Sequence, residues 1–155
     1  MGMWRGSVAV LARVGLIGMP PPPMTSLAIP TLISVAALVL YQGTALWVGK
    51  ARFQHKVMPP ATSGPPEFER VLRVQQNTLE QLVFFLPCFW LASLVSQASV
   101  AAVLGILWVA GRLAYAVGYI QAPEKRGPGF GISFLSSVVL LVMALVGAIA
   151  QVLHG

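Results

Sequence analysis

Residues 69–86 read ERVLRVQQNTLEQLVFFL, and this stretch decides the fold. Its second half is an apolar run of the kind that crosses a membrane, whereas its first half carries arginines, amides and a glutamate. Ionisable groups inside a membrane span are costly, and they usually face a protein interior or a water-filled cavity. The polar members of the stretch include Arg70, Arg73, Gln75, Gln76, Asn77 and Glu80. Because they gather in one place, we expect a polar pocket here.

The composition of the whole chain favours a membrane protein. Its 155 residues are 57% hydrophobic and only 9% charged, whereas soluble domains carry about 25% charged residues. A helix that spans a bilayer needs roughly 20 apolar residues, and four stretches meet this length: residues 27–49, 67–96, 99–121 and 129–153. Helices satisfy their backbone groups internally, as lipid requires. We therefore predict an all-α, integral membrane four-helix bundle formed by one domain, residues 26–155.

Residues 1–25 form a leader before the first expected span. Arg5 and Arg13 flank a short apolar run that ends at the four prolines of residues 20–23. A charged start followed by a short apolar stretch resembles a signal peptide weakly. Two other interpretations are a disordered leader and an over-extended gene start with the true initiator at Met24, and we favour the last.

The positive charges lie mainly in two of the expected loops. The formal net charge is +6, which taken alone could suggest a nucleic-acid binder. However, the cations concentrate between the first and second spans (Lys50, Arg52, Lys56), at the start of the second (Arg70) and between the third and fourth (Lys125, Arg126). Loops rich in lysine and arginine stay on the cytoplasmic side of a membrane. We therefore expect both loops in the cytoplasm, both termini on the opposite side and no nucleic-acid partner.

Several kinds of chemistry are excluded by residue type and spacing. The chain has no aspartate, so a Ser-His-Asp triad is impossible, and it has no glycine-rich phosphate loop. His55 and His154 have no cysteines or carboxylates near them at metal-ligand spacing, so we expect no metal. Cys88 is the only cysteine and lies in a span, where packing is a better explanation than nucleophilic reactivity.

Two polar stripes point to a binding site. A helix turns by about 100° per residue, which places two sets of side chains on one face each: Arg73, Asn77 and Glu80 in the second span, and Arg112, Tyr115 and Tyr119 in the third. The short turn at residues 96–99 makes these spans an antiparallel hairpin. The two stripes therefore meet near the cytoplasmic surface, and Arg126 follows in the adjoining basic loop.

The donors and acceptors of the two stripes suit a small zwitterion that carries more than one carboxylate. Arginine binds carboxylates through paired hydrogen bonds, Glu80 can hold an amine, and Asn77 can serve a peptide group. Glutathione has two carboxylates, one ammonium, two amides and a thiol that an arginine can activate. The alternative is that Glu80 pairs with Arg112 or Arg73 and merely locks the bundle, since buried polar groups do pair.

Three motifs closely resemble those of the MAPEG family, the membrane-associated proteins of eicosanoid and glutathione metabolism. They are GPPEFERVLRVQQNTLEQ at residues 64–81, RLAYAVGY at residues 112–119 and PEKR at residues 123–126. The resemblance extends from about residue 27 to the C-terminus, and it leans to the branch of microsomal glutathione transferases and leukotriene-forming synthases. The chain departs from the leukotriene-forming pattern in two places. It has Gln81 where an aromatic residue is usual, and its proline comes later, at Pro87.

This resemblance implies a homotrimer with glutathione, as co-substrate, between neighbouring subunits. It implies that glutathione contacts Arg73, Asn77, Glu80, Tyr115 and Tyr119, with Arg112 in support and with Arg52 and Gln75 supplied by the neighbouring subunit. Arg126 resembles the family's catalytic, thiolate-activating arginine. The helical geometry agrees with two subunits, because Gln75 points to the side of its helix roughly opposite Arg73 and Glu80.

The function that we predict is a membrane-bound glutathione transferase acting on lipophilic electrophiles, with possible peroxidase activity on lipid hydroperoxides. Its membrane would be the inner membrane of a bacterium or the endoplasmic reticulum of a eukaryote, with the site on the cytoplasmic side. The alternatives are a non-catalytic, lipid-binding MAPEG-type scaffold, a small transporter and a purely structural bundle. Trp108, Phe130 and Phe134 either line a site for the lipophilic substrate or simply pack toward lipid.

Overall fold

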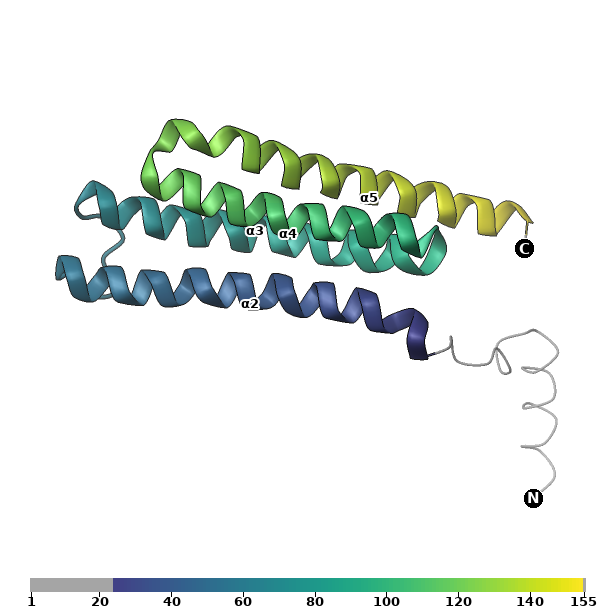
Figure 1. Cartoon of the computed structure of the whole chain (residues 1–155), viewed down its shortest axis with the longest axis horizontal. Helices are drawn as coiled ribbons and strands as arrows, with labels where there is room; N and C mark the ends of the chain where they lie inside the picture. The colour runs from purple at the N-terminus through teal and green to yellow at the C-terminus, as the bar shows by residue number, and fades with distance from the viewer. Residues whose placement is uncertain (1–23, 155) are drawn as a thin grey trace, which may run out of the picture.

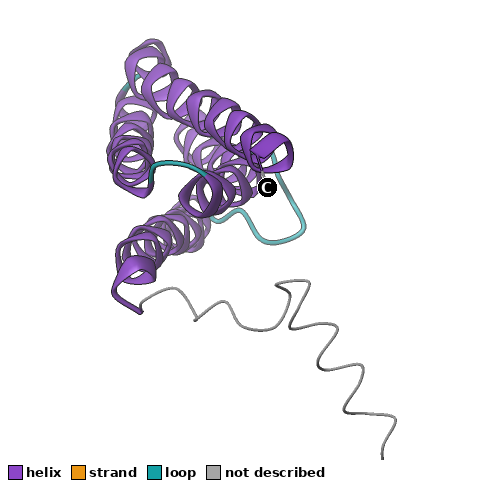
Figure 2. Cartoon of the chain, turned by 90° about the vertical axis from the view of Figure 1, so that its right-hand side faces the viewer, coloured by secondary structure: helices purple, strands orange, loops and turns teal. Residues whose placement is uncertain are grey.

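Long apolar segments interrupted by proline-rich connections give this chain its four helices. The structure is a computed structural model, and it describes residues 24–154. The helices are α2 (Met24–His55), α3 (Pro66–Val95), α4 (Ala98–Gln121) and α5 (Gly127–His154), and a short 3₁₀ helix, η1 (Pro123–Arg126), precedes α5. Within these residues the chain consists only of helices and their connections (Figure 2). The all-α prediction is confirmed, and residues 1–23 of the expected leader lie outside the described residues.

All four helices are long and apolar enough to cross a membrane. Large apolar side chains point outward along them, and Val39, Leu46 and Val83 are each about two-thirds exposed. In water such a surface would be unfavourable, whereas the hydrocarbon of a bilayer accepts it. The described chain therefore has the construction of a multi-pass membrane bundle.

The helices lie side by side along their length (Figure 1). Helix α2 packs against α3 and α4, and α5 packs against the same two helices on the other side, so α3 and α4 form the centre of the bundle. The α2–α3 connection and η1 lie at one end, and the α3–α4 turn and the C-terminus lie at the other (Figure 1). This arrangement brings the two basic connections of the sequence together.

Aromatic stacking fills the centre of the bundle. Phe85 of α3 stacks on Trp108 of α4 with ring centroids 4.0 Å apart and on Phe89 at 5.3 Å. Leu140 of α5 joins the same buried cluster. Trp108 is fully buried, so it neither faces lipid nor lines an open site. Its large apolar rings stabilise the α3–α4 contact instead.

Helix α2 is longer than the span expected at residues 27–49. It ends at His55, where Lys56 takes a left-handed conformation (φ 56°) and the Val57 amide donates to the Arg52 carbonyl at 3.1 Å. This is a Schellman cap, and the buried Val57 side chain completes it. The apolar run of the sequence predicts only the part of the helix that crosses the membrane. The cap determines the residue at which the helix ends. At the other end α2 begins at Met24, so Pro30 lies inside the helix rather than in its first turn.

Helices α4 and α5 approach closely because glycines face each other at their contact. A Cβ on Gly129 would collide with the backbone nitrogen of Tyr115, and one on Gly111 would lie 2.9 Å from the backbone nitrogen of Ser133. Small residues permit such close contact between membrane helices. Small residues of α4 and α5 thus allow the two helices to pack closely, and the contact holds Tyr115 against the start of α5.

Candidate functional site

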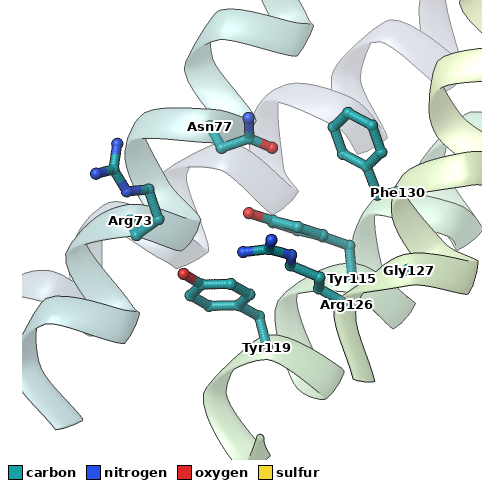
Figure 3. Close-up of a pocket in the computed structure, with 7 residues that line it drawn as sticks. All are labelled: Arg73, Asn77, Tyr115, Tyr119, Arg126, Gly127 and Phe130. Carbon is teal, nitrogen blue, oxygen red and sulfur yellow. The ribbon is translucent and has the colours of Figure 1, made fainter. Parts of the chain in front are cut away.

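A polar cavity opens where α3, α4 and the start of α5 meet. Its volume is about 580 Å³, and its lining consists of Arg73, Asn77, Tyr115, Tyr119, Arg126, Gly127 and Phe130. Five of these seven are residues that the sequence assigned to the site (Figure 3). The two predicted stripes therefore do converge, at the end of the bundle that carries the basic connections.

The walls of the cavity are pairs of residues one helical turn apart. Arg73 and Asn77 project from α3, and Tyr115 and Tyr119 project from α4 with their rings stacked at 5.7 Å between centroids. Figure 3 shows Arg73 and Phe130 on opposite sides of the cavity, with the tyrosines between them. This arrangement offers cations, an amide and phenol groups to one small ligand.

Arg126 enters the cavity from the short helix η1. Pro123 begins this 3₁₀ turn, and the Lys125 amide donates to the Ala122 carbonyl at 2.9 Å. The chain passes so close to α4 that a Cβ on Gly118 would lie 2.8 Å from the Lys125 carbonyl oxygen. As a result the Arg126 side chain lines the cavity, and its guanidinium carbon lies 5.6 Å from the Tyr119 ring centroid (Figure 3).

Arg112 lies behind the cavity rather than in its lining. Its side chain is fully buried, and it donates to Asn77 Oδ1 at 3.1 Å and to Thr78 Oγ1 at 2.8 Å. Its guanidinium carbon also lies 4.1 Å from the centroid of the Tyr115 ring. Arg112 therefore contacts both walls of the cavity from inside the bundle, which agrees with a supporting role.

Glu80 lies at the edge of the site and outside the cavity lining. Its carboxylate accepts a hydrogen bond from Asn77 Nδ2 at 3.3 Å. In the part of the chain that the structure describes, Glu80 forms no ion pair with Arg112 or Arg73. The alternative in which such a pair merely locks the bundle therefore does not describe this structure.

Gln75 and Arg52 lie away from the cavity of their own chain. Gln75 Nε2 donates to the Tyr41 hydroxyl on α2 at 3.1 Å. Arg52 donates to the carbonyls of Val57 and Ala61 at 3.2 and 2.9 Å and lies 5.1 Å from the Phe68 ring centroid. Within one chain these two residues hold α2 and its connection in place. Any contact that they make with glutathione would have to be in a neighbouring subunit's site.

The structure adds Gly127 to the cavity lining, and it also brings Phe130, which was expected either in a site for the lipophilic substrate or against lipid, to the same cavity. Phe130 packs against Tyr115 at 6.2 Å and Phe134 at 5.9 Å between ring centroids. The four-residue spacing of Arg126, Phe130 and Phe134 indicates, from the sequence, that these side chains lie on the same face. Thr78, which supports Arg112, could have been noticed as a hydroxyl inside an apolar span.

A second cavity of about 460 Å³ adjoins the first toward the end of the bundle. It shares Arg73 and Tyr119 with the first cavity and has Glu69, Arg70 and Gln76 as further polar lining. Glu69 Oε1 accepts a hydrogen bond from the Gly64 amide at 3.0 Å, which closes the connection over the start of α3. Arg70 thus borders the second cavity and not the first. No group of three potential metal ligands occurs among the described residues.

Comparison with known proteins identifies the family. The sequence profile of the MAPEG family matches residues 30–146. The chain belongs to the MAPEG family. It is 42% identical to the microsomal glutathione S-transferase 2 of Mus musculus over 107 residues, which cover 69% of this chain and 73% of that protein.

Two other relatives match the chain over about four-fifths of its length. It is 34% identical to the leukotriene C4 synthase of Cavia porcellus over 126 residues, covering 81% of this chain and 84% of the synthase. It is 51% identical over 127 residues to an uncharacterised protein of Synechocystis sp., covering 82% of this chain and 93% of that protein. The predicted resemblance to the MAPEG family and its transferase and synthase branch is confirmed.

Proposed function

We propose that this MAPEG protein is a membrane-bound glutathione transferase. The observation that carries the proposal is the cavity itself, in which two arginines, an asparagine and two tyrosines from three helical elements surround one space. The names of its relatives, a glutathione S-transferase and a leukotriene C4 synthase, support the same reaction class. In this proposal glutathione is a co-substrate.

The cavity suits glutathione because its lining is cationic and rich in hydrogen-bond donors. Arg73 and Arg126 offer guanidinium groups to the two carboxylates or the thiolate, and charge-assisted hydrogen bonds of this kind are the strong ones. Tyr115 and Tyr119 add phenol groups, and Asn77 adds an amide. The Glu80 carboxylate, held beside Asn77, is the available partner for the ammonium group.

Arg126 activates the thiol in this proposal. A free thiol has a pKa of about 8.5, and a nearby cation lowers the pKa of an acid by about 1–3 units. The thiolate is the nucleophile. It attacks the electrophilic carbon of an apolar substrate, the sulfur–carbon bond forms, and the electron pair leaves with the departing group or with the atom next to the attacked carbon.

Peroxidase activity uses the same thiolate with a different acceptor. The thiolate attacks an oxygen of a lipid hydroperoxide and the O–O bond breaks, leaving the lipid alcohol and an oxidised sulfur. The thiol of a second glutathione then attacks that sulfur, which forms glutathione disulfide and releases the oxygen taken from the hydroperoxide as water. Because apolar acceptors concentrate in the bilayer, an enzyme of this type gains from being embedded there. In this proposal Phe130, which lines the cavity, offers them an apolar surface.

The wider setting belongs to the same proposal. Residues 26–155 form one membrane domain, and three copies assemble so that Arg52 and Gln75 of one subunit reach the site of the next. Homo-oligomers usually have closed symmetry, and cyclic trimers are one of its forms. The basic connections and the cavity face the cytoplasm by the charge rule for membrane proteins.

A lipid-binding scaffold without catalysis is the second candidate function. An apolar groove of about 470 Å³ between α2 and α4, with Trp47 at one end and Val109 and Leu113 in its wall, favours it. A groove of this composition accepts an acyl chain whether or not the polar cavity is catalytic. The two functions therefore differ only in what happens to glutathione.

One experiment separates the candidates. The full chain is purified in detergent, glutathione binding is measured by calorimetry, and glutathione-dependent turnover is followed with a model electrophile and with a lipid hydroperoxide. The transferase proposal expects both binding and conjugation. Binding without turnover of either acceptor would leave the scaffold, and the absence of any glutathione binding would reject both the transferase and its site.

A further inference from the structure

We propose that Arg112, anchored on Thr78, sets the orientation of the Asn77 amide and thereby makes Asn77 a hydrogen-bond donor to the ligand. This inference rests on the proposed function for the identity of the ligand, but the contacts that carry it lie within the chain. Arg112 and Thr78 are positioning residues here, since they act on the ligand only through Asn77 and Tyr115.

Thr78 is an obligate acceptor for Arg112. Both side chains are fully buried between α3 and α4. The single hydroxyl proton of Thr78 is donated to the Val74 carbonyl at 2.7 Å. A hydroxyl has one donor and two acceptor lone pairs, so the remaining capacity of Thr78 Oγ1 is to accept, and it accepts from Arg112 at 2.8 Å.

The neighbouring contact of Arg112 selects one of the two possible Asn77 orientations. Arg112 has only N–H donors, so it must face the oxygen of the Asn77 amide, which it does at 3.1 Å. The amide nitrogen then lies toward Glu80 Oε2, at 3.3 Å. Because Nδ2 has two hydrogens and Glu80 takes one, the other remains for a ligand in the cavity that Asn77 lines. The ligand atom at this position must be an acceptor, such as a carboxylate or peptide oxygen.

The charge of Arg112 supports a role in the site rather than in stability. No carboxylate pairs with it among the described residues, and its Nε has no hydrogen-bond partner there. A buried charge without a counterion is costly, and a purely structural contact would gain from an acid beside it. Arg112 instead lies on the Tyr115 ring at 4.1 Å. It thus fixes one residue in each wall of the cavity and leaves its positive charge to favour an anionic ligand.

The test removes the hydroxyl of Thr78, which accepts the hydrogen bond from Arg112, and keeps the shape of the side chain. In Thr78→Val the hydroxyl is lost, whereas Thr78→Ser retains it, and Thr78→Cys is a second variant with only a weak acceptor in case the valine protein does not fold. Thr44→Val is the matched control, because Thr44 is also buried and bonds only to a carbonyl of its own helix, that of Tyr41 at 2.7 Å. Thermal unfolding in detergent shows which variants are folded.

Two readouts are needed. The first is the pair of Asn77 side-chain amide resonances in ligand-free protein, assigned by their loss in Asn77→Ser. We expect them to move in Thr78→Val and Thr78→Cys, and to keep their wild-type positions in Thr78→Ser and Thr44→Val. The second is glutathione affinity, which we expect to weaken by about tenfold in Thr78→Val, the usual effect of losing a hydrogen bond to a charged group. Turnover at saturating glutathione should stay within about twofold, since the thiolate-activating arginine is untouched.

The possible failures are distinguishable. Unmoved Asn77 resonances in a folded Thr78→Val protein overturn the inference whatever the protein binds. If the Asn77 resonances move in Thr78→Val but the wild-type protein does not bind glutathione, the inferred orientation of Asn77 stands and the proposed function is rejected. A drop in saturating turnover equal to the drop in affinity, without rescue by serine, would also overturn the inference, because general loosening of the bundle would then explain the data.

Discussion

Arg126 is the residue on which the proposed chemistry depends. Its side chain lines the cavity with the guanidinium carbon 5.6 Å from the Tyr119 ring centroid, and η1 holds it there without a carboxylate partner among the described residues. A cation in this position is free to stabilise a thiolate. It is also one of several donors to the ligand, so its loss should affect reactivity more than binding.

We expect Arg126→Ala to bind glutathione within a few-fold of the wild type and to lose most conjugation at neutral pH. A nearby cation lowers the thiol pKa, so removing Arg126 raises the pKa of bound glutathione toward its ordinary value of about 8.5. The thiolate fraction at pH 7 then falls by about tenfold or more, and activity should recover as the pH rises through that value. The measurements are calorimetric affinity and a pH–rate profile, with Arg126→Lys as the charge-retaining control. Full activity of the alanine variant at pH 7 would reject the role.

Arg73 and Arg70 form a matched pair on α3. Arg73 lines the main cavity, whereas Arg70, three residues earlier, borders only the second one. We expect Arg73→Ala to weaken glutathione affinity by about tenfold or more, the effect of losing a charge-assisted hydrogen bond, and Arg70→Ala to change it by less than about threefold. Titration of both variants by calorimetry checks this. Equal losses in the two proteins would mean that overall charge, rather than the cavity lining, attracts the ligand.

The end of α2 is decided by its cap and not by its composition. Lys56 adopts a positive φ of 56° so that the Val57 amide can close on the Arg52 carbonyl. The same cap places Val57 in a small buried cluster with Ala51 and Phe68. The Arg52 side chain then donates to the connection that follows, so the cap also sets where this arginine is presented.

Glycine should be better than lysine at position 56. A side chain in the left-handed region costs about 1 kcal/mol, so we expect Lys56→Gly to raise the unfolding temperature in detergent. Lys50→Gly is the control, because Lys50 is an exposed residue inside the same helix, where glycine costs about 0.8–1.0 kcal/mol relative to alanine. The two identical substitutions should therefore change stability in opposite directions. A decrease in both would show that the cap is not the helix end in the membrane-embedded protein.

At the scale of the whole molecule, the site of one chain lacks two of the residues that the family resemblance assigned to it. Gln75 donates to Tyr41, and Arg52 donates to the carbonyls of its own connection. Both lie away from the cavity lining. In a trimer whose sites lie between neighbouring chains, Arg52 and Gln75 of one chain would reach the cavity of the next. In a monomeric enzyme these two residues would take no part in the site.

Mixing two inactive chains tests shared sites directly. One chain carries Arg126→Ala, and the other carries Arg52→Ala together with Gln75→Ala. If each site uses Arg126 of one subunit and Arg52 and Gln75 of the next, co-expression regenerates complete sites in roughly a quarter of positions in a cyclic oligomer. We expect activity of about this fraction in co-purified oligomers and almost none in either parent. No recovery in verified mixed oligomers would place the whole site in one chain.

The sequence predicted most of this protein because its signals are local. Apolar runs of membrane length define four helices, and helical spacing predicts that Arg73 and Asn77 share a face, as do Tyr115 and Tyr119. A short turn between two spans makes them antiparallel, which puts the two faces at a similar level in the membrane. Four residues of the cavity lining follow from these rules, and Arg126 was expected from its place in the basic connection after the third span.

Only the tertiary structure decided which partners the polar and aromatic side chains have. Whether Glu80 bonds to an arginine or to Asn77, whether Trp108 faces lipid or stacks on Phe85, and whether Arg112 reaches the cavity or lies behind it all depend on contacts between helices. Helical periodicity gives the direction of a side chain around its own axis. It does not give the rotation and depth at which two helices meet, because close packing of glycines and aromatic rings across the interface sets these.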